Sequence, residues 1–379
     1  MKWSWRIGRI AGIGVYVHAT FVLLLVWIAL VEYRASGRLA AVAPALLLVL
    51  AVFAIVVLHE LGHALTARRY GIATRDITLL PIGGVARLER MPREPRQELL
   101  IALAGPAVNV VLAALLYALL AATGGAPAAG GLAAPDLAAG DGAGQARTLL
   151  ARLVGVNVML AAFNLIPAFP MDGGRVLRAV LAMRSGDYER ATAQAARVAR
   201  VFALLFGVVG LFVVGNPFLV FIALFVWLGA AGEAAAVQSS ATLSGVRVER
   251  VMMTDVRTLA PSDTLERAVR FVLDGFQQDF PVVESGQVVG VLTRAKLLRT
   301  LAERGPSERV ASAMHRDFQA VSPDEPIEEV LTKLQACGCH TMPVVRDRTL
   351  LGLLSTENVG EFMMVQAALR GSHAEYVPA

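Results

Sequence analysis

Long apolar stretches alternate with short polar segments along the chain up to residue 235. Six of them approach the roughly 20 apolar residues that a membrane-spanning helix needs. They cover residues 11–32, 41–66, 97–123, 147–168, 198–214 and 217–235. The first stretch is too long, and too poor in small residues at its end, for a cleavable signal peptide. The pattern therefore predicts an α-helical polytopic membrane domain with six transmembrane helices.

Residues 71–90 follow a different pattern. Apolar and polar positions are interleaved here on both sides of Pro81-Ile82-Gly83-Gly84. Alternation around a glycine turn predicts a short β-hairpin. Residues 124–146 are rich in Gly and Ala and contain no Lys or Arg, which is typical of a flexible loop.

The rest of the chain contains an internal repeat. Each copy reads as strand, helix, strand, strand, helix, which predicts a pair of small α/β modules. We expect a membrane domain over 1–235, a linker over 236–246, modules over 247–306 and 307–370, and a tail over 371–379. The matched positions are Met252, Asp255, Pro261, Glu266, Pro281, Val282, Val283 and Gly290 with Met314, Asp317, Pro323, Glu328, Pro343, Val344, Val345 and Gly352.

Composition supports this division. Hydrophobic residues make up 56% of the chain and charged residues 17%, whereas soluble globular proteins carry about 25% charged residues. The net charge of +5 divides into +8 over residues 1–235 and −3 over the rest. This distribution favours a membrane domain with basic flanks over a nucleic-acid binder. Two cysteines are too few for a disulfide-rich scaffold.

Charge placement orients the helices, because Lys and Arg are enriched on the cytoplasmic side of membrane proteins. Lys2, Arg6 and Arg9 precede the first apolar stretch, and Arg68 and Arg69 follow the second. We therefore expect a multi-pass protein of the plasma membrane with a cytoplasmic N-terminus and a cytoplasmic tail. A further cluster on the same side comprises Arg175, Arg178, Arg184, Arg190, Arg197 and Arg200.

The strongest chemical signal is His59-Glu60-Leu61-Gly62-His63 at the end of the second apolar stretch. Residues four apart on a helix lie about 40° apart on one face and about 6 Å along the axis, so both imidazoles can reach one Zn²⁺. Glu60 can then act as a general base toward water. The alternative is a polar helix end that faces lipid headgroups, but such residues inside an apolar helix are costly without partners.

A catalytic zinc usually takes three protein ligands. Asp172 is the best third candidate, because it ends the fourth span and the topology places it on the same cytoplasmic face as His59 and His63. The alternative role for Asp172 is to cap a helix over 175–183. Pro167 and Pro170 keep the preceding segment from forming a regular helix, which membranes tolerate mainly beside a cavity.

The two motifs together, His59–His63 and Asn164…Pro167…Pro170-Met171-Asp172-Gly173-Gly174, resemble the site-2 protease family of intramembrane zinc metalloproteases. The repeats are similar to tandem cystathionine-β-synthase-type (CBS) modules. The combination resembles the branch that includes the sporulation factor processing protease of bacilli. The resemblance implies one zinc per chain, held by His59, His63 and Asp172, with Glu60 as the base.

The resemblance also implies roles for other residues. Asn164 would help hold the substrate or the oxyanion, and the hairpin at Gly83 and Gly84 matches a membrane re-entrant loop that pairs with an unwound substrate. Gly105-Pro106 and Asn109 match a structural element of the family. Met171 stands where the family commonly has Leu.

CBS pairs of this kind usually bind adenine nucleotides such as ATP or AMP in a cleft between the modules. Thr293 and Ser355 keep the hydroxyl of the family pattern, whereas Lys296 and Asn358 replace its Asp, and Lys296 could favour phosphate. A structural role that joins chains into a homo-oligomer is the alternative.

The sequence thus predicts regulated intramembrane proteolysis: a zinc endopeptidase that cleaves membrane-spanning or membrane-associated proteins under the control of the CBS pair. A CBS-regulated transporter or channel and an inactive scaffold are the alternatives. His18 is expected to be a partnered structural histidine. The spacing of Cys337 and Cys339 with His340 fits neither a haem nor a zinc motif. Both cysteines are expected to be a reduced pair in the cytoplasm, with redox sensing as the alternative.

Overall fold

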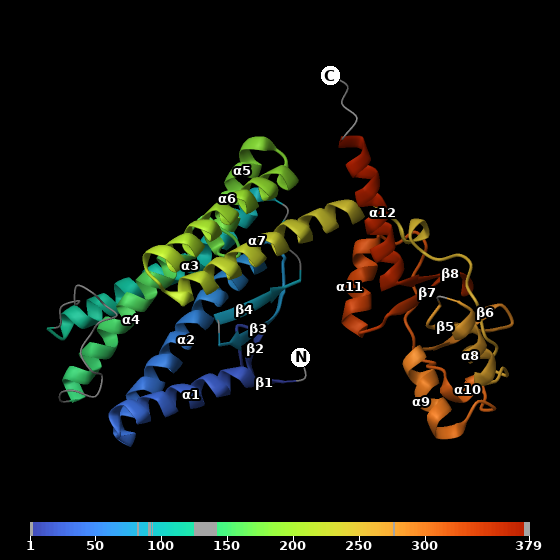
Figure 1. Cartoon of the computed structure of the whole chain (residues 1–379), viewed down its shortest axis with the longest axis horizontal. Helices are drawn as coiled ribbons and strands as arrows, with labels where there is room; N and C mark the ends of the chain where they lie inside the picture. The colour runs from blue at the N-terminus through green and yellow to red at the C-terminus, as the bar shows by residue number, and fades with distance from the viewer. Residues whose placement is uncertain are drawn as a thin grey trace. The chain divides into compact units, whose positions relative to one another are not determined.

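A computed structural model of the chain describes residues 3–81, 83–89, 92, 94–124, 142–275 and 277–374 (Figure 1). It divides into two compact units, Met1–Val237 and Gln238–Ala379. Most of the predicted loop over 124–146 lies outside the described residues, as does the end of the predicted tail.

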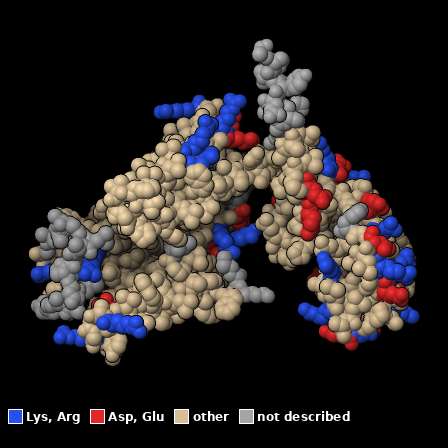
Figure 2. Space-filling model, in the orientation of Figure 1, with Lys and Arg blue, Asp and Glu red and all other residues tan. Residues whose placement is uncertain are grey.

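The first unit contains the six predicted spans. Each is a helix long and apolar enough to cross a membrane, and Figure 2 shows few charged side chains over the long helices, with Lys and Arg gathered over α5 and the start of α6. The helices are α1 (Ala19–Ser36), α2 (Leu39–Arg69), α3 (Pro95–Ala122), α4 (Gly142–Asn164), α6 (Tyr188–Val208, extended by a π-helical turn to Val213) and α7 (Pro217–Leu243).

The beginning of the first span is corrected by the structure. Residues 11–32 were predicted to be helical, but α1 starts at Ala19, and the segment before it forms strands β1 (Ser4–Ile10) and β2 (Ile13–His18). Ile13 and Val15 are buried, so this stretch has the two-residue period of a strand with one buried face. The apolar content of the stretch hid that period.

The predicted hairpin is present as β3 (Thr74–Leu80) and β4 (Gly83–Leu88), which pair antiparallel with Leu80 opposite Gly83. It is part of a larger sheet of order β1-β2-β3-β4, in which β2 and β3 run parallel. The sheet packs on α1 and α2 through a buried cluster, and each fully buried side chain of this size contributes about 1.5–3 kcal/mol. Its members are Ile13, Val15, Phe21, Phe53, Val57, Leu61, Ala64, Ile77 and Leu79.

A short helix, α5 (Asp172–Ser185), lies between the fourth and fifth spans. The segment before it is irregular, as Pro167 and Pro170 predict, and it is not loosely packed: Ala168, Phe169 and Met171 are buried against α6 and α7. This segment and α5 carry the second chemical motif, so their packing decides where Asp172 lies.

The second unit is an α/β pair of modules around one sheet of order β5-β6-β8-β7. Its elements are α8 (Leu265–Asp274), β5 (Phe280–Glu284), β6 (Gln287–Leu292), α9 (Arg294–Arg304), α10 (Val310–Ala313), α11 (Ile327–Cys337), β7 (Thr341–Arg346), β8 (Thr349–Ser355) and α12 (Thr356–Ala374), with a 3-10 turn at Val248–Arg250.

The two modules exchange their leading segments. Met253 pairs with Leu353 of the second module, and His315 pairs with Val291 of the first. The repeated glycines make this possible: a Cβ on Gly352 would lie 2.6 Å from the Met253 carbonyl oxygen, and one on Gly290 would lie 2.9 Å from that of His315. The leading segment of each module therefore packs in the core of the other module.

Residues 236–246 do not form an extended linker. Helix α7 continues through them to Leu243, and Leu243 and Val246 are buried in the core of the second module. The hydrophobic side chains of this segment make it part of the fold of the second unit.

Candidate metal centre

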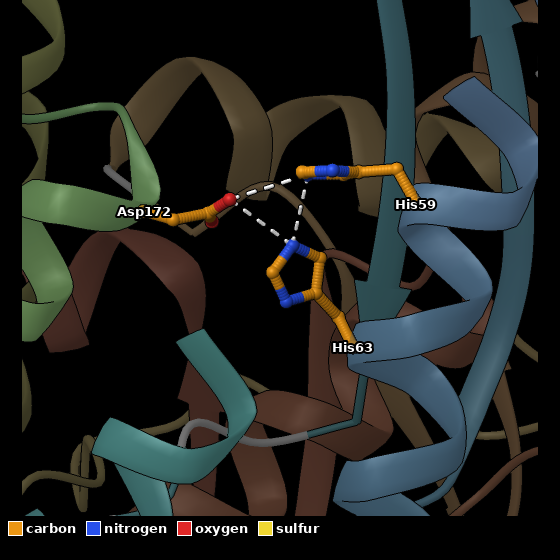
Figure 3. Close-up of side chains that lie close together, drawn as sticks. All are labelled: His59, His63 and Asp172. Atoms are coloured by element: carbon orange, nitrogen blue, oxygen red, sulfur yellow. Dashed lines mark hydrogen bonds and ion pairs between the residues drawn. The ribbon is translucent and has the colours of Figure 1, made fainter. Parts of the chain in front are cut away.

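His59 and His63 lie one turn apart on α2 and point to the same place, as the helical spacing predicts (Figure 3). Their Nε2 atoms are 3.1 Å apart. Both side chains are buried. Helix α3 approaches α2 closely here: a Cβ on Gly105 would lie 2.2 Å from His63 Nε2 and 2.6 Å from His59 Nε2. Only glycine leaves the space that these two nitrogen atoms occupy.

Helix α3 also fixes the tautomer of both rings. His63 Nδ1 lies 2.7 Å from the carbonyl oxygen of Ile101, which can only accept a hydrogen bond. His59 Nδ1 lies 2.5 Å from Asn109 Oδ1, and the amide nitrogen of Asn109 donates to Asn157. Each Nδ1 therefore carries the hydrogen, and each neutral ring turns the lone pair of Nε2 toward its partner.

Asp172 is the first residue of α5 and is buried. Its Oδ2 lies 3.2 Å from Nε2 of His59 and 3.2 Å from Nε2 of His63. Gly173 and Gly174 permit this placement, because a Cβ on Gly173 would lie 2.3 Å from the Ile166 carbonyl oxygen and one on Gly174 2.5 Å from the Phe169 nitrogen. The expected alternative, in which Asp172 caps the helix, does not occur: Met171 holds the cap position.

Three lone-pair atoms thus face one another at 3.1–3.2 Å without a hydrogen between them. Asp172 Oδ2 is a buried oxygen without a hydrogen-bond partner. Such an arrangement is repulsive unless a cation lies among the three atoms. Ligand atoms about 2.0–2.1 Å from a tetrahedral zinc lie about 3.3 Å apart. The two imidazoles and the carboxylate therefore fit Zn²⁺ in type, number and spacing, and they are the one group of this kind among the described residues.

Glu60 is half-buried next to the cluster and is backed by strand β4. A Cβ on Gly84 would lie 2.9 Å from Cγ of Glu60 and 2.9 Å from Cγ1 of Val56. The hairpin therefore touches the side chain that the sequence nominates as the base. In the sheet order, β4 is an edge strand.

Known proteins match both parts of the chain. Residues 47–208, which contain both chemical motifs, match peptidase family M50, and residues 248–303 and 310–363 match the CBS domain. A zinc metalloprotease of Methanocaldococcus jannaschii is 32% identical over 369 residues, which cover 96% of this chain and 97% of the relative. The chain belongs to peptidase family M50.

Another relative and one solved structure also match this M50 protein. The sequence named for the zinc metalloprotease Rip3 of Mycobacterium tuberculosis is 31% identical over 387 residues. The match covers 95% of this chain and 92% of the Rip3 chain. The solved structure of a site-2 protease from Methanocaldococcus jannaschii is 35% identical and covers 61% of this chain and 95% of its own, with a TM-score of 0.43. The predictions of a zinc metalloprotease and of a CBS pair are confirmed at the level of the family.

Other predicted residues of the M50 domain make hydrogen bonds of their own. Asn164 ends α4, and its amide nitrogen donates one hydrogen to the Leu160 carbonyl oxygen, which leaves the second hydrogen for another acceptor. Asn109, expected to be structural, is the hydrogen-bond partner of His59. Asn157, which sequence reasoning missed, supports Asn109. A buried Asn in each of two adjacent apolar spans was the signal that could have found this pair.

Two of the three residues predicted to bind a nucleotide, Thr293 and Ser355, cap helices instead. Thr293 accepts a hydrogen bond from the Lys296 backbone nitrogen, and Ser355 accepts one from that of Asn358. A pocket in the first module lies elsewhere, and Thr293, Lys296 and Ser355 do not line it. It is lined by Met253, Asp255, Arg257, Phe271, Asp274, Gly275 and Gln277.

His18 is a partnered structural histidine: its ring caps α1 by accepting from the Thr20 backbone nitrogen. Cys337 and Cys339 are joined in a disulfide, so the expectation of reduced cysteines is not met. Gly338 between them adopts a left-handed conformation at the end of α11, which brings their Cα atoms to 5.2 Å.

Proposed function

We propose that this protein is an intramembrane zinc endopeptidase in which His59, His63 and Asp172 hold one zinc ion and Glu60 is the general base. The convergence of three buried lone-pair atoms supports this assignment most strongly. Zinc bound there supplies a Lewis acid that polarises a peptide carbonyl and makes a water molecule more acidic. The charge on Asp172 partly balances that of the ion.

Residues around the cluster have separate roles in proton transfer, in orienting the imidazoles and in binding the substrate. Glu60 takes a proton from the attacking water and returns it to the leaving amine nitrogen as the peptide bond breaks. Asn109 and the Ile101 carbonyl oxygen keep both imidazoles in the tautomer that offers Nε2. The second amide hydrogen of Asn164 donates to the substrate or to the developing oxyanion.

The proposed substrate is a membrane-spanning or membrane-associated protein. Its helix must unwind, because helical hydrogen bonds hide the scissile carbonyl group. The outer edge of β4, at Gly83 and Gly84, offers backbone groups that pair with the unwound segment and hold it extended beside Glu60.

The hairpin can be tested apart from the metal. Replacing Gly84 with Val pushes on Cγ of Glu60, which lies 2.9 Å from the position of its Cβ. We expect cleavage to fall by about 10²-fold, the cost of a misplacement of roughly 1 Å, while zinc content stays unchanged. Gly8→Val in β1 is the matched control, because a Cβ there has no atom within 4 Å. Equal activity of the two variants contradicts a role for this contact.

For the second unit we propose that the CBS pair binds ATP or AMP, regulates cleavage and joins chains into a homo-oligomer. The Arg257 guanidinium in the pocket of the first module suits a phosphate group. The basic residues before α1 and after α2 support a plasma-membrane protein with its N-terminus, active site and CBS pair in the cytoplasm. Calorimetry of the full chain with ATP and light scattering in detergent test binding and assembly, and a null result in either removes that part.

Metal removal tests the function directly. The purified protein is expected to contain about one zinc per chain, to lose cleavage of a membrane-spanning substrate when a chelator strips the metal, and to regain it when zinc is added back. His59→Ala and Asp172→Ala should each lower the zinc content, whereas His340→Ala, in the second unit, should not. Undiminished cleavage by metal-free protein would overturn the proposal.

A further inference from the structure

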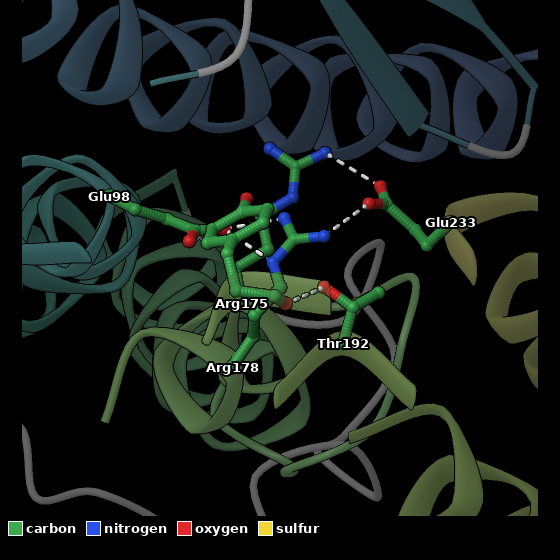
Figure 4. A network of polar contacts seen from close by, with 6 residues as sticks. Glu98, Arg175, Arg178, Thr192 and Glu233 are labelled. Atoms are coloured by element: carbon green, nitrogen blue, oxygen red, sulfur yellow. Dashed lines mark hydrogen bonds and ion pairs between the residues drawn. The ribbon is translucent and has the colours of Figure 1, made fainter. Parts of the chain in front are cut away.

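A buried ion network lies beside the metal centre and was not predicted from the sequence. Arg178, on α5, is 1% exposed. Its Nε and Nη2 donate to Oε1 of Glu98 at 2.8 and 2.5 Å, and its Nη1 donates to Oε2 of Glu233 at 3.0 Å (Figure 4). Glu98 belongs to α3 and Glu233 to α7. One side chain thus ties three helices together.

Aromatic rings hold the same guanidinium in place. Its central carbon lies 4.9 Å from the centre of the Phe169 ring and 5.1 Å from that of Tyr188. Burial by itself lowers the pKa of Arg178, but electrostatic interactions with Glu98 first, and then with Tyr188 and Glu233, hold that pKa above its usual value. The Arg178 guanidinium is therefore positively charged, and both carboxylates accept its hydrogen bonds. These two carboxylates and the two aromatic rings leave it little freedom to move.

The network joins the two halves of the metal centre. Glu98 lies one turn before Ile101 on α3, the helix that holds His63 through Ile101 and His59 through Asn109. Arg178 lies six residues after Asp172 on α5, within the same rigid helix. The Glu98–Arg178 contact therefore sets the position of the helix that carries the carboxylate relative to the helix that orients the imidazoles.

We propose that Arg178 is a positioning residue for the zinc site, and that Glu98 and Glu233 act through it to hold Asp172 against His59 and His63. This inference rests on the proposed metal site. Groups that hydrogen-bond metal ligands directly typically change metal affinity by about 10–100-fold, and we expect Arg178, which acts through the position of α5, to fall at the lower end of that range.

A double variant separates positioning from folding. Removing one partner of a buried ion pair leaves an unpaired charge, whereas replacing both partners with uncharged side chains is often neutral for stability. We therefore expect Arg178→Met to weaken both the thermal stability and the zinc affinity of the full-length protein. Glu233 keeps an ion pair with Arg175, whose Nη2 lies 3.5 Å from Oε1 of Glu233. Arg178→Met combined with Glu98→Gln should therefore recover stability but still bind zinc about 10-fold or more weakly than the wild type, as measured by competition with a chromogenic chelator.

Arg184→Met is the matched control, because Arg184 is an exposed arginine in the last turn of the same helix. It should bind zinc as tightly as the wild type. Wild-type affinity in the folded double variant overturns the inference and leaves the metal site standing. Failure of the wild type itself to bind zinc overturns the proposed function instead, so the two outcomes are distinct.

Discussion

Glu60→Gln is expected to lower the rate of peptide cleavage by at least about 10²–10⁴-fold, the usual contribution of general acid–base catalysis. Glutamine has nearly the same shape but cannot take a proton from water at neutral pH. Because Glu60 is not one of the three converging ligands, the variant should keep about one zinc per chain. Single-turnover cleavage of a membrane-spanning substrate and elemental analysis of the same sample provide the two measurements.

The pairing of lost activity with retained metal is what identifies a base. Loss of both would instead make Glu60 a structural or metal-binding residue, and near wild-type cleavage would exclude it from the reaction. Glu32→Gln provides the control, since Glu32 is a half-buried glutamate in α1 that is not part of the metal cluster, and this variant should behave as the wild type.

Gly105→Ala is expected to disrupt the zinc site although no ligand is changed. The added Cβ would lie 2.2 Å from His63 Nε2 and 2.6 Å from His59 Nε2, so both imidazoles or the α3 backbone must move. A displacement of about 1 Å can cost 10²-fold in rate, and we expect at least that loss in cleavage together with a reduced zinc content.

The control for helix propensity and membrane insertion is Gly232→Ala in α7, where a Cβ has no atom within 4 Å. This variant should cleave as the wild type does. If Gly105→Ala also keeps full activity and its zinc, then α3 is not packed against the imidazoles as closely as the structure shows.

The sequence indicated the parts of the site that follow from local spacing or from topology. His59 and His63 are one turn apart on any helix, and the parity of the spans put Asp172 on the same side as both. The hairpin at Gly83 was visible because its alternation is interrupted by a glycine turn. These features depend on few long-range contacts.

Features that depend on packing between distant segments escaped prediction. The strand character of residues 13–18 was hidden by a sequence apolar enough to read as a helix. Arg178 read as one of several basic flanking residues, because its partner Glu98 is 80 residues away in the chain. The exchange of leading segments between the CBS modules, at Met253 and His315, could not be seen in the sequence repeat, because the repeat shows only which positions correspond.

The separation of Arg178 from Glu98 has a consequence for biosynthesis. Glu98 enters the bilayer with the third span, and its partner is made 80 residues later. At about 5–20 residues per second, this interval lasts roughly 4–16 s. During that time a membrane-inserted carboxyl group lacks its guanidinium. A chain that stalls or is truncated before α5 keeps that unpaired acid permanently, which distinguishes an incomplete protein from a finished one inside the membrane.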